Sequence, residues 1–544
     1  MRPENEKKYE TPNLADTPAR HPVGSFGTIR QQLQFGLKAG ASWNSMSGVS
    51  GIFVHETYYS NYQFTDKSYF APTASLFYNY HKENFMQTSE TYAYDAIGNV
   101  TGYTSIAGDE ISAQIDYHEK GLLRNSPRSI AISSGGTQLR KRSSEIDDKG
   151  NITKLTVEGQ GLVQDYNMEY DQYGNMTYFE GPQDGNGERM SFEIEYDPVL
   201  HRLPTSVTDV FGYTSSTTYD YLWALPLSVT DINGETVEYT YDELGRLETV
   251  TAPYEREAGQ AYTIAFDYHP EAAVPYARTR NYTQEGDIET YTFCDNLARV
   301  IQVKKTGVVE GQKMNIVSGV QKWDAYGRVV FESLPFTEPL ASAATLNTTG
   351  GNEYATTTQY DVMDRTTVQT LPDESKTTME YEISTGGVGE LHTTVTDPEG
   401  RKTESVTDAR GRTVKEIKKS ENGDLEVDYL FDALGQLLEV THPNGRQTKY
   451  VYDGLGRTLS VDHPDAGMTT FTYDLAGNVL TKQTAKLRDE IASGGVITYK
   501  YDHNRLTDIV YPKNVFNCVK YTYGEPGAPH GRAGRIALVE DGSG

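Results

Sequence analysis

Three aspartates recur once every 21 residues in the second half of the chain, and regularly spaced carboxylates could in principle act as an acid–base pair. Asp432, Asp453 and Asp474 each open one phrase, in which two variable residues, a Gly and a polar residue follow. Asp first and Gly fourth is typical of a type I turn that closes a hairpin through a Gly at positive φ. The Asp side chain then bonds the amides of its own turn. We therefore interpret these aspartates as turn formers and assign no catalytic residue.

Aromatic residues mark the strands that must hold these turns. Two aromatics at a spacing of two precede each aspartate, as Tyr450 and Tyr452 precede Asp453. This alternation places both rings on one face of a strand. Pro464 follows Asp453 by eleven residues, and Pro marks a strand end because it cannot donate a ladder hydrogen bond. One repeat is therefore a strand, an Asp turn, a second strand and a Pro turn.

The same offset of eleven residues extends through much of the chain. The pairs are Asp171 and Pro182, Asp242 and Pro253, Asp324 and Pro335, Asp361 and Pro372, Asp432 and Pro443, and Asp453 and Pro464. The pattern predicts an all-β fold, a repetitive antiparallel ribbon of β-hairpins that curls around part of a cavity. Its aspartate turns should lie on one rim of the ribbon and its prolines on the other.

Two kinds of contact are expected between successive hairpins. Rings from adjacent hairpins should stack across neighbouring strands, each pair contributing about 0.2–1 kcal/mol. The arginines that follow the turn glycines should pair with a neighbouring turn Asp along the rim, as a modest surface interaction. They are Arg246, Arg328, Arg412 and Arg457.

Residue composition and the presence of the Asp phrase divide the chain into three parts. Residues 1–25 are polar and rich in Pro, which predicts a disordered arm. Residues 26–90 are rich in aromatic residues but lack the Asp phrase, and we interpret them as a capping or plug segment, or else as worn repeats. Residues 91–544 form the repeat array. The sequence ends on a turn phrase without a return strand, which predicts a truncated shell, either a piece of a longer polypeptide or one partner of an assembly.

Three stretches interrupt the repeat and are predicted to be inserted loops. They are residues 254–282, 340–352 and 485–495. The last stretch should contain two helical turns that stop at Gly494.

Composition excludes several classes of partner. The chain has 49 basic and 76 acidic residues, a net charge of −27, so its folded surface should repel nucleic acid. Cys294 and Cys518 have neither the spacing of a zinc site nor a disulfide framework around them, so we assign no metal and no cofactor. No apolar run is long enough for a membrane span, and no signal peptide is visible.

The phrases at 239–246 and 450–457, which read Y-x-Y-D-x-L-G-R, and Y-D-L-A-G-N at 473–478 resemble the YD repeat of the Rhs, Tc-toxin and teneurin proteins. The resemblance extends over about residues 90–535. It implies a ribbon of hairpins that spirals into a hollow shell, which in Rhs and Tc proteins encloses a toxic C-terminal polypeptide. The core-terminal cleavage motif of those bacterial shells and the toxin that follows it do not occur in this sequence.

The resemblance implies a structural shell segment of a bacterial Rhs-like or Tc-like toxin system, secreted or placed at the cell surface. Its expected partners are an enclosed or covalently linked polypeptide and other shell segments. One alternative is a cell-surface adhesion protein that binds carbohydrate or protein. Another is an enzyme, an autoprotease or glycosidase, although the sequence has no motif of a known active site.

Two matches to functional motifs are interpreted as turn chemistry. Asp184, Asn186, Glu188 and Glu195 hold calcium-loop positions, but Arg189 stands where such a loop requires Gly. Residues 397–400 match the D-P-x-G of a cleavage motif but lie in the middle of the array. Neither match is expected to be a site.

Overall fold

A computed structural model of the chain describes residues 52–542, with gaps at 65–66, 82–83, 122, 352–353, 385–388 and 492–494. The predicted arm at 1–25 and the first part of the predicted 26–90 segment lie outside the described residues. Antiparallel strands form nearly all of the regular secondary structure in the described chain and belong to two sheets of 22 and 18 strands. The predicted all-β hairpin ribbon is therefore confirmed.

The first sheet contains every described strand up to residue 318 and, in addition, one later strand. Its strands are β1 (Ile52–Phe64), β2 (Lys67–His81), β3 (Asn84–Tyr94), β4 (Val100–Ala107), β5 (Asp109–Tyr117), β6 (Pro127–Ser134), β7 (Thr137–Ile146), β8 (Ile152–Gly159), β9 (Leu162–Tyr170), β10 (Met176–Gln183), β11 (Arg189–Tyr196), β12 (Pro204–Asp209), β13 (Thr214–Asp220), β14 (Leu225–Thr230), β15 (Thr236–Tyr241), β16 (Leu247–Thr251), β17 (Ile264–His269), β18 (Tyr276–Asn281), β19 (Ile288–Cys294), β20 (Val300–Val309), β21 (Gln312–Ser318) and the later β24 (Phe336–Pro339).

The second sheet holds the rest of the chain. Its strands are β22 (Gln321–Trp323), β23 (Val329–Ser333), β25 (Ala355–Tyr360), β26 (Thr366–Thr370), β27 (Lys376–Ile383), β28 (Leu391–Thr396), β29 (Lys402–Thr407), β30 (Thr413–Lys418), β31 (Leu425–Phe431), β32 (Leu437–Thr441), β33 (Gln447–Tyr452), β34 (Thr458–His463), β35 (Gly467–Tyr473), β36 (Val479–Gln483), β37 (Ile497–Asp502), β38 (Arg505–Val510), β39 (Val519–Tyr523) and β40 (Ile536–Asp541). The short helices are α1 (Pro253–Glu257), η2 (Leu340–Ser342), α2 (Ala485–Glu490) and η3 (Val515–Asn517).

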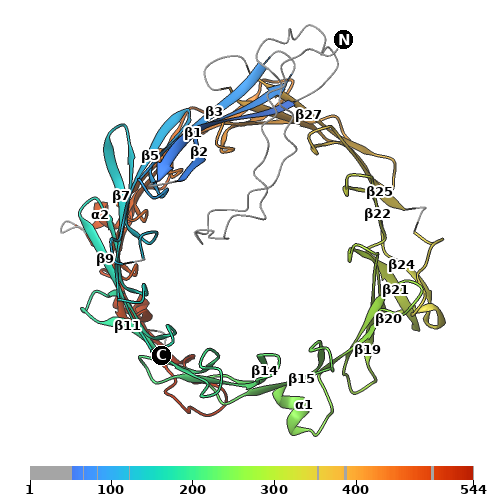
Figure 1. The fold of residues 1–544 in the computed structure, drawn as a ribbon. Coiled ribbons are helices and arrows are strands. Elements are labelled where there is room, and N and C mark those ends of the chain that lie inside the picture. Colours follow the sequence, from blue (N-terminus) through green and yellow to red (C-terminus); the bar gives the residue numbers. More distant parts are fainter. Residues whose placement is uncertain are drawn as a thin grey trace.

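The ribbon curves into a ring around an open centre and then overlaps its own beginning (Figure 1). The first sheet runs most of the way round, and the second sheet completes the circle and continues alongside the first. Strand β27 lies against β2 and β3, and the C-terminal end comes to lie near β11. The described chain is therefore a wall of more than one turn.

Each hairpin follows from the predicted repeat. In both sheets consecutive strands pair antiparallel, so alternate turns fall on opposite edges of the ribbon. The full Asp phrases occupy one edge, here called the aspartate rim, and the six prolines lie at or beside connections on the other edge, the proline rim, as predicted. Degenerate copies of the phrase, in which Thr replaces the aromatic residue before the Asp, close turns on the proline rim at Asp209, Asp231 and Asp397. An Asp phrase can therefore replace the Pro turn.

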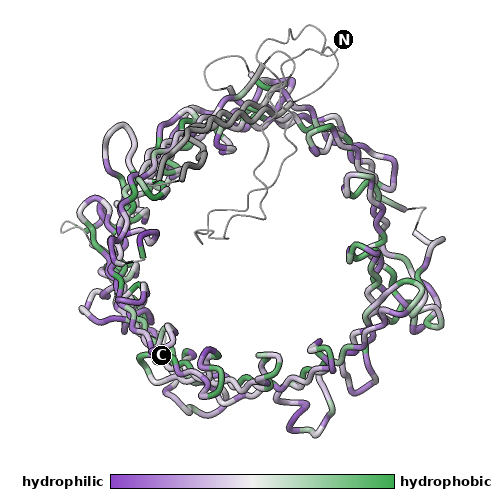
Figure 2. Tube along the Cα trace, in the orientation of Figure 1, coloured by the Kyte–Doolittle hydropathy of each residue, from purple (hydrophilic) through white to green (hydrophobic). Residues whose placement is uncertain are grey.

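The wall has no thick apolar core. Hydrophilic and hydrophobic residues alternate all round the ring (Figure 2), as expected of strands in a wall one sheet thick. Few large apolar side chains of the described chain are fully buried, and Phe293, Val317 and Ile383 are the largest of them. The wall must therefore depend on contacts between successive hairpins.

One of the three predicted insertions is wrong in part. Residues 254–282 contain α1, and then β17 and β18, which pair with each other and continue the first sheet. The interruption is only the helical segment, because Pro253 starts a helix where other repeats turn directly. Residues 340–351 form a loop with one 3-10 turn. Helix α2 lies where helical turns were predicted at 485–495 and ends at Glu490, whereas the predicted stop at Gly494 lies outside the described residues.

Candidate functional site

The Asp phrase builds a turn that is rigid on its own. At Asp453 the backbone N–H of Gly456 donates to the Asp carbonyl at 3.0 Å, and one carboxylate oxygen accepts from the amides of Leu455 and Arg457, each at 2.9 Å. Gly456 has φ near 91°, which a residue with a Cβ rarely adopts. The carboxylates are occupied by their own turns, as the sequence predicted.

The arginine after the turn joins one hairpin to the next. Arg457 Nε bonds the carboxylate of its own Asp453 at 2.6 Å, and its Nη1 bonds the backbone carbonyl of Asp474 in the next aspartate turn. Its guanidinium also lies 4.9 Å from the ring centre of Tyr473. The prediction that these arginines pair with a neighbouring Asp side chain along the rim holds for Arg328, which binds Asp364 in the next turn at 2.9 Å. It is wrong for Arg246 and Arg457, whose carboxylate partner is the Asp of their own turn. Arg412 binds its own Asp408 and, on the first sheet, the carboxylate of Asp109.

The predicted ladder of stacked rings is also wrong for the most regular repeats. Among the described residues of 427–483, no ring–ring contact joins the aromatic residues before the aspartates, and Phe431, Phe471 and Tyr473 contact cations instead. In six units the arginine that follows the turn lies over a ring near the next turn on the same rim, and in four of the six this ring directly precedes an Asp. The pairs are Arg246 with Tyr268, Arg299 with Trp323, Arg328 with Tyr360, Arg365 with Tyr381, Arg412 with Phe431, and Arg457 with Tyr473. The ring is thus the platform for a cation, an interaction worth about 0.5–2 kcal/mol.

A tyrosine hydroxyl provides a second link between hairpins. Tyr452 donates to the carbonyl of Leu437 at 2.8 Å, and Tyr473 donates in the same way to Thr458 at 2.7 Å. In both cases the acceptor lies five residues after the preceding motif Asp. This reach explains why Tyr is so common before the turn, since Phe offers the ring without the hydroxyl.

We expect Tyr452→Phe to lower the free energy of unfolding by about 0.5–1.5 kcal/mol, the net value of one hydrogen bond. Tyr450 lies on the same strand and no hydrogen bond is recorded for its hydroxyl among the described residues, so Tyr450→Phe is a matched control. Urea unfolding of both variants measures the difference. Equal effects would show that the hydroxyl of Tyr452 does not stabilise the wall.

The two turns of the ribbon meet along a seam, where the proline rim of the first sheet lies against the aspartate rim of the second. Eight hydrogen bonds join residues about 300 positions apart in sequence. They run from Arg410 to the carbonyl of Asp109 (2.9 Å), from Arg412 to the carboxylate of Asp109 (3.2 Å), from Arg140 to Gly454 (3.1 Å), from Gln164 to Leu475 (2.5 Å), from the Gly185 amide to the carboxylate of Asp474 (3.0 Å), from Asn186 to Tyr501 (3.0 Å), from the Tyr213 hydroxyl to Gly524 (2.6 Å), and from Arg505 to the Tyr213 hydroxyl (3.1 Å).

Two glycines bring the backbones of the two turns together at the seam. A Cβ added to Gly454 would lie 2.1 Å from the carbonyl carbon and oxygen of Gly159, and one added to Gly159 would lie 2.1 Å from the oxygen of Gly454. In other copies of the phrase, the place of Gly454 holds Glu243, Ala433 or Leu475. The close approach therefore requires Gly at this copy alone.

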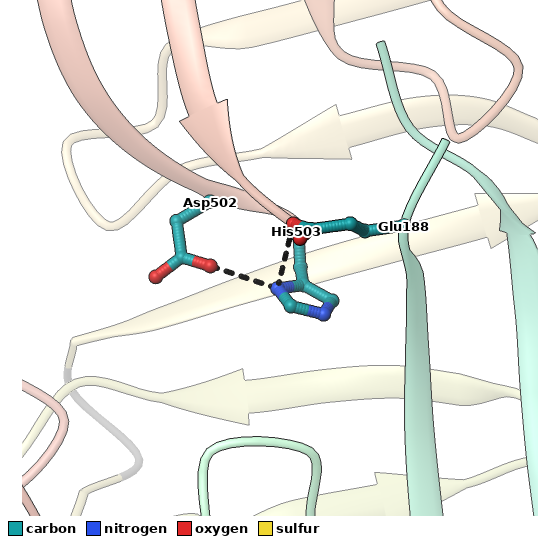
Figure 3. A group of neighbouring side chains, drawn as sticks. All are labelled: Glu188, Asp502 and His503. Atoms are coloured by element: carbon teal, nitrogen blue, oxygen red, sulfur yellow. Dashed lines mark hydrogen bonds and ion pairs between the residues drawn. The ribbon is translucent and has the colours of Figure 1, made fainter. Parts of the chain in front are cut away.

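A group of ionisable side chains lies at one point of the seam (Figure 3). His503 Nδ1 is 2.8 Å from a carboxylate oxygen of Asp502 and 3.7 Å from one of Glu188, which comes from the first sheet. These atoms lie within 4.8 Å of one another, as ligands of a divalent metal do. Arg505 binds the other oxygen of Asp502 at 2.5 Å and already neutralises one carboxylate. The arrangement is that of a cross-seam ion pair.

Asp197 shows how strongly one turn can hold a carboxylate. It is almost fully buried, and its two oxygens accept from the amides of Val199, Leu200, Arg202 and Leu203 at 2.5–3.0 Å. Burial by itself raises the pKa of Asp197, but these backbone hydrogen bonds outweigh burial and hold the pKa well below its ordinary value.

A folded-state pKa below the unfolded value gives stability that is present above the unfolded pKa and is lost as the pH falls through the folded pKa. We therefore expect the wild-type urea midpoint to fall as the pH drops below about 4, the ordinary Asp pKa. Asp197→Asn should make this loss shallower, whereas Asp148→Asn, at a carboxylate that is 95% exposed, should leave the profile as in the wild type. Identical acid profiles for Asp197→Asn and the wild type would contradict the assignment.

The suspected functional motifs lie in ordinary turns. Asp184 accepts from the amides of Asn186 and Glu188, and Glu195 lies within β11 and pairs with β12. Asp397 closes a turn through the Gly400 amide at 2.9 Å. The interpretation of both matches as turn chemistry is consistent with these contacts. Cys294 and Cys518 are both free thiols.

A hollow of about 550 Å³ lies over β28 to β32. His392, Lys415, Asp428 and Tyr429 are among its lining residues. His392 is bonded to Glu404 at 2.6 Å, and Lys415 pairs with Asp428 at 3.1 Å, so these charges are already matched within the sheet. No described helix is long and apolar enough to cross a membrane.

Sequence comparison identifies the repeat. The RHS Repeat family matches residues 225–257 and 431–468, which are two of the stretches where the Asp phrase, the arginine link and the tyrosine link occur together. The chain contains RHS repeats. The comparison with curated proteins gave no match.

Solved structures share the fold of most of this wall. The RHS-repeat chain superposes on a crystal structure of TcdB2-TccC3 with a TM-score of 0.70 at 15% identity, over 90% of this chain and 33% of that one. TcdB2-TccC3 without its hypervariable C-terminal region gives 0.71 at 14% identity, over 90% and 35%. A Tc holotoxin pore of Photorhabdus luminescens with mutated TccC3 gives 0.71 at 14%, again over 90% and 35%. The RHS-repeat chain spans about a third of the length of these structures.

Proposed function

We propose that this RHS-repeat chain is a wall segment of a hollow shell that encloses a polypeptide. The observation that supports this most strongly is the seam, because rim-to-rim docking closes successive turns into a continuous wall around an open centre. The fold of the Tc structures is consistent with such a wall. The shell would belong to a bacterial, Rhs-like or Tc-like toxin system and act outside the producing cell, and its partners would be the enclosed polypeptide and other shell segments.

Protection of a passenger from protease tests the proposal. The chain would be produced together with the polypeptide encoded next to it, and the purified assembly would be digested with proteinase K. We expect the passenger to survive while added free passenger is degraded. Digestion of the passenger at the same rate in both cases would contradict enclosure.

We propose that the wall itself carries out no turnover. The carboxylates of the described Asp phrases are bound to their own turns, and His392, Lys415 and Asp428 in the hollow over β28 to β32 are paired within the sheet. Incubation of the purified chain alone, with and without glycans, should give neither self-cleavage nor glycan hydrolysis. Either reaction would favour the autoprotease or glycosidase alternative, and specific retention on a glycan array would favour adhesion.

A further inference from the structure

The junction between the two sheets holds a polar group unlike any other in the described wall. Lys304 on β20, Asn315 on β21 and Glu338 on β24 come from three adjacent strands, and their exposed fractions are 0%, 0% and 6%. Asn315 pairs directly with Glu338. Lys304 pairs with Val317, so Asn315 is its diagonal neighbour on the same face, within reach of a long side chain.

The amine and the amide share one carboxylate oxygen. Lys304 Nζ donates to Glu338 Oε1 at 2.5 Å, and Asn315 Nδ2 lies 3.4 Å from the same atom and donates to the Pro339 carbonyl at 3.0 Å. The Asn315 carbonyl oxygen is buried and has no hydrogen-bond partner. An unbonded amide oxygen in a buried site carries an energetic cost, so the structure leaves the oxygen of this amide unsatisfied.

The surroundings exclude water from this group. The ring of Phe293, 1% exposed, lies 5.6 Å from Lys304 Nζ. The carbonyls of Ser342 and Thr345, in the loop that follows β24, cover the other side of the ammonium. A buried site of low dielectric favours the uncharged forms of an amine and a carboxyl over the charged forms.

We propose that Lys304 and Asn315 form an intramolecular amide bond, with Glu338 as the proton carrier. The Lys304 ammonium passes one proton to Glu338, and the resulting neutral Nζ attacks Cγ of Asn315. The C–N bond to Nζ forms and the bond from Cγ to Nδ2 breaks. The leaving nitrogen takes up the proton held by Glu338 and departs as ammonia, and the Glu338 carboxylate then accepts the second proton from Nζ. No oxidant, reductant or cofactor is needed.

The unreacted side chains rest as an ion pair. Burial raises the pKa of Glu338, but the hydrogen bonds from Lys304 and Asn347 outweigh it and lower the pKa. The first step therefore moves a proton against its resting preference, along a hydrogen bond of 2.5 Å. Loss of ammonia to solvent then makes the overall reaction irreversible.

Asn347 is the competing amide, and its geometry makes it a matched control. Its Nδ2 donates to the other oxygen of Glu338 at 2.8 Å, but its amide oxygen accepts from the backbone of Thr349 and Gly350. Asn347 is also only half-buried. The side-chain carbonyl of Asn347 is thus held by two backbone hydrogen bonds of the loop, whereas the side-chain carbonyl of Asn315 accepts no hydrogen bond.

Peptide mass spectrometry of the purified full chain tests the bond. Trypsin cannot cleave after an acylated Lys304, so we expect the peptide 300–305 joined to 314–322, with a mass lower than their sum by one ammonia. The intact chain should show the same deficit. Recovery of 314–322 as a free peptide with Asn315 intact, and an intact mass without the deficit, would overturn the proposal.

Variants assign the roles. Lys304→Arg, Asn315→Ala and Glu338→Gln should each abolish the joined peptide, whereas Asn347→Ala should retain it. A joined peptide that persists in Glu338→Gln, or that contains residue 347 in place of 315, would contradict the assignment. The wild-type measurement remains decisive even if one of these variants fails to fold.

Discussion

Gly454→Glu should open the seam of the RHS-repeat wall and lower the free energy of unfolding by about 1–3 kcal/mol or more, the cost of overpacking. The first carbon of any side chain at this position falls 2.1 Å from the backbone of Gly159, which belongs to the other turn. Backbone cannot move aside as a flexible side chain can, so the two turns must separate. We expect a lower urea midpoint together with a larger radius in small-angle scattering.

Ala96→Glu is the matched control. Ala96 holds the same place in the Asp95 phrase, but it is exposed on the aspartate rim of the first sheet, where no contact with another turn is recorded in the described residues. This variant should keep the wild-type radius and midpoint. Equal effects of Gly454→Glu and Ala96→Glu would show that the damage is to the turn and not to the seam.

Arg505→Ala should have the second-largest effect, a loss of about 2–3 kcal/mol, because one side chain makes several contacts across the seam. Its guanidinium lies 3.3 Å from the ring centre of Phe211 and donates to the Tyr213 hydroxyl at 3.1 Å, both on the first sheet. It also binds Asp502 within its own turn at 2.5 Å. Removal leaves the Asp502 carboxylate and the Tyr213 hydroxyl without this donor.

Arg446→Ala provides the comparison for this second variant. Arg446 pairs with Asp465 on the proline rim of the second sheet, and both side chains are more than half exposed. Exposed ion pairs contribute about 0–1 kcal/mol, so this variant should remain close to the wild type in thermal and urea unfolding. A loss as large as that of Arg505→Ala would contradict the proposed importance of the cross-seam contacts.

The repeat itself could be predicted from the sequence because its causes are local. A type I turn with Asp first and Gly fourth depends on residues within five positions, so Asp453 and its counterparts identified the hairpins and both rims. Contacts between hairpins were predicted with less success. Arg457 and Tyr473 lie 16 positions apart, and their types alone did not show that a cation would lie over the ring instead of another ring.

The seam could not be predicted because it joins residues about 300 positions apart, and the curvature that brings them together is a property of the whole ribbon. One signal was present in the sequence. Gly454 stands where Glu243, Ala433 and Leu475 occupy other copies, and a Gly without a turn requirement suggests a close approach. The buried polar group at the junction of the two sheets could not be predicted either. Lys304, Asn315 and Glu338 follow no motif and meet only because β24 returns to the first sheet.

The central claim is that successive turns of the ribbon dock rim to rim and enclose an open centre. Electron microscopy of the purified RHS-repeat chain tests it most directly, with Gly454→Glu and Ala96→Glu imaged in parallel. We predict closed rings with a hollow centre for the wild type and Ala96→Glu, and open or widened arcs for Gly454→Glu. Wild-type particles that are open ribbons, or compact bodies without a central hollow, would contradict the account.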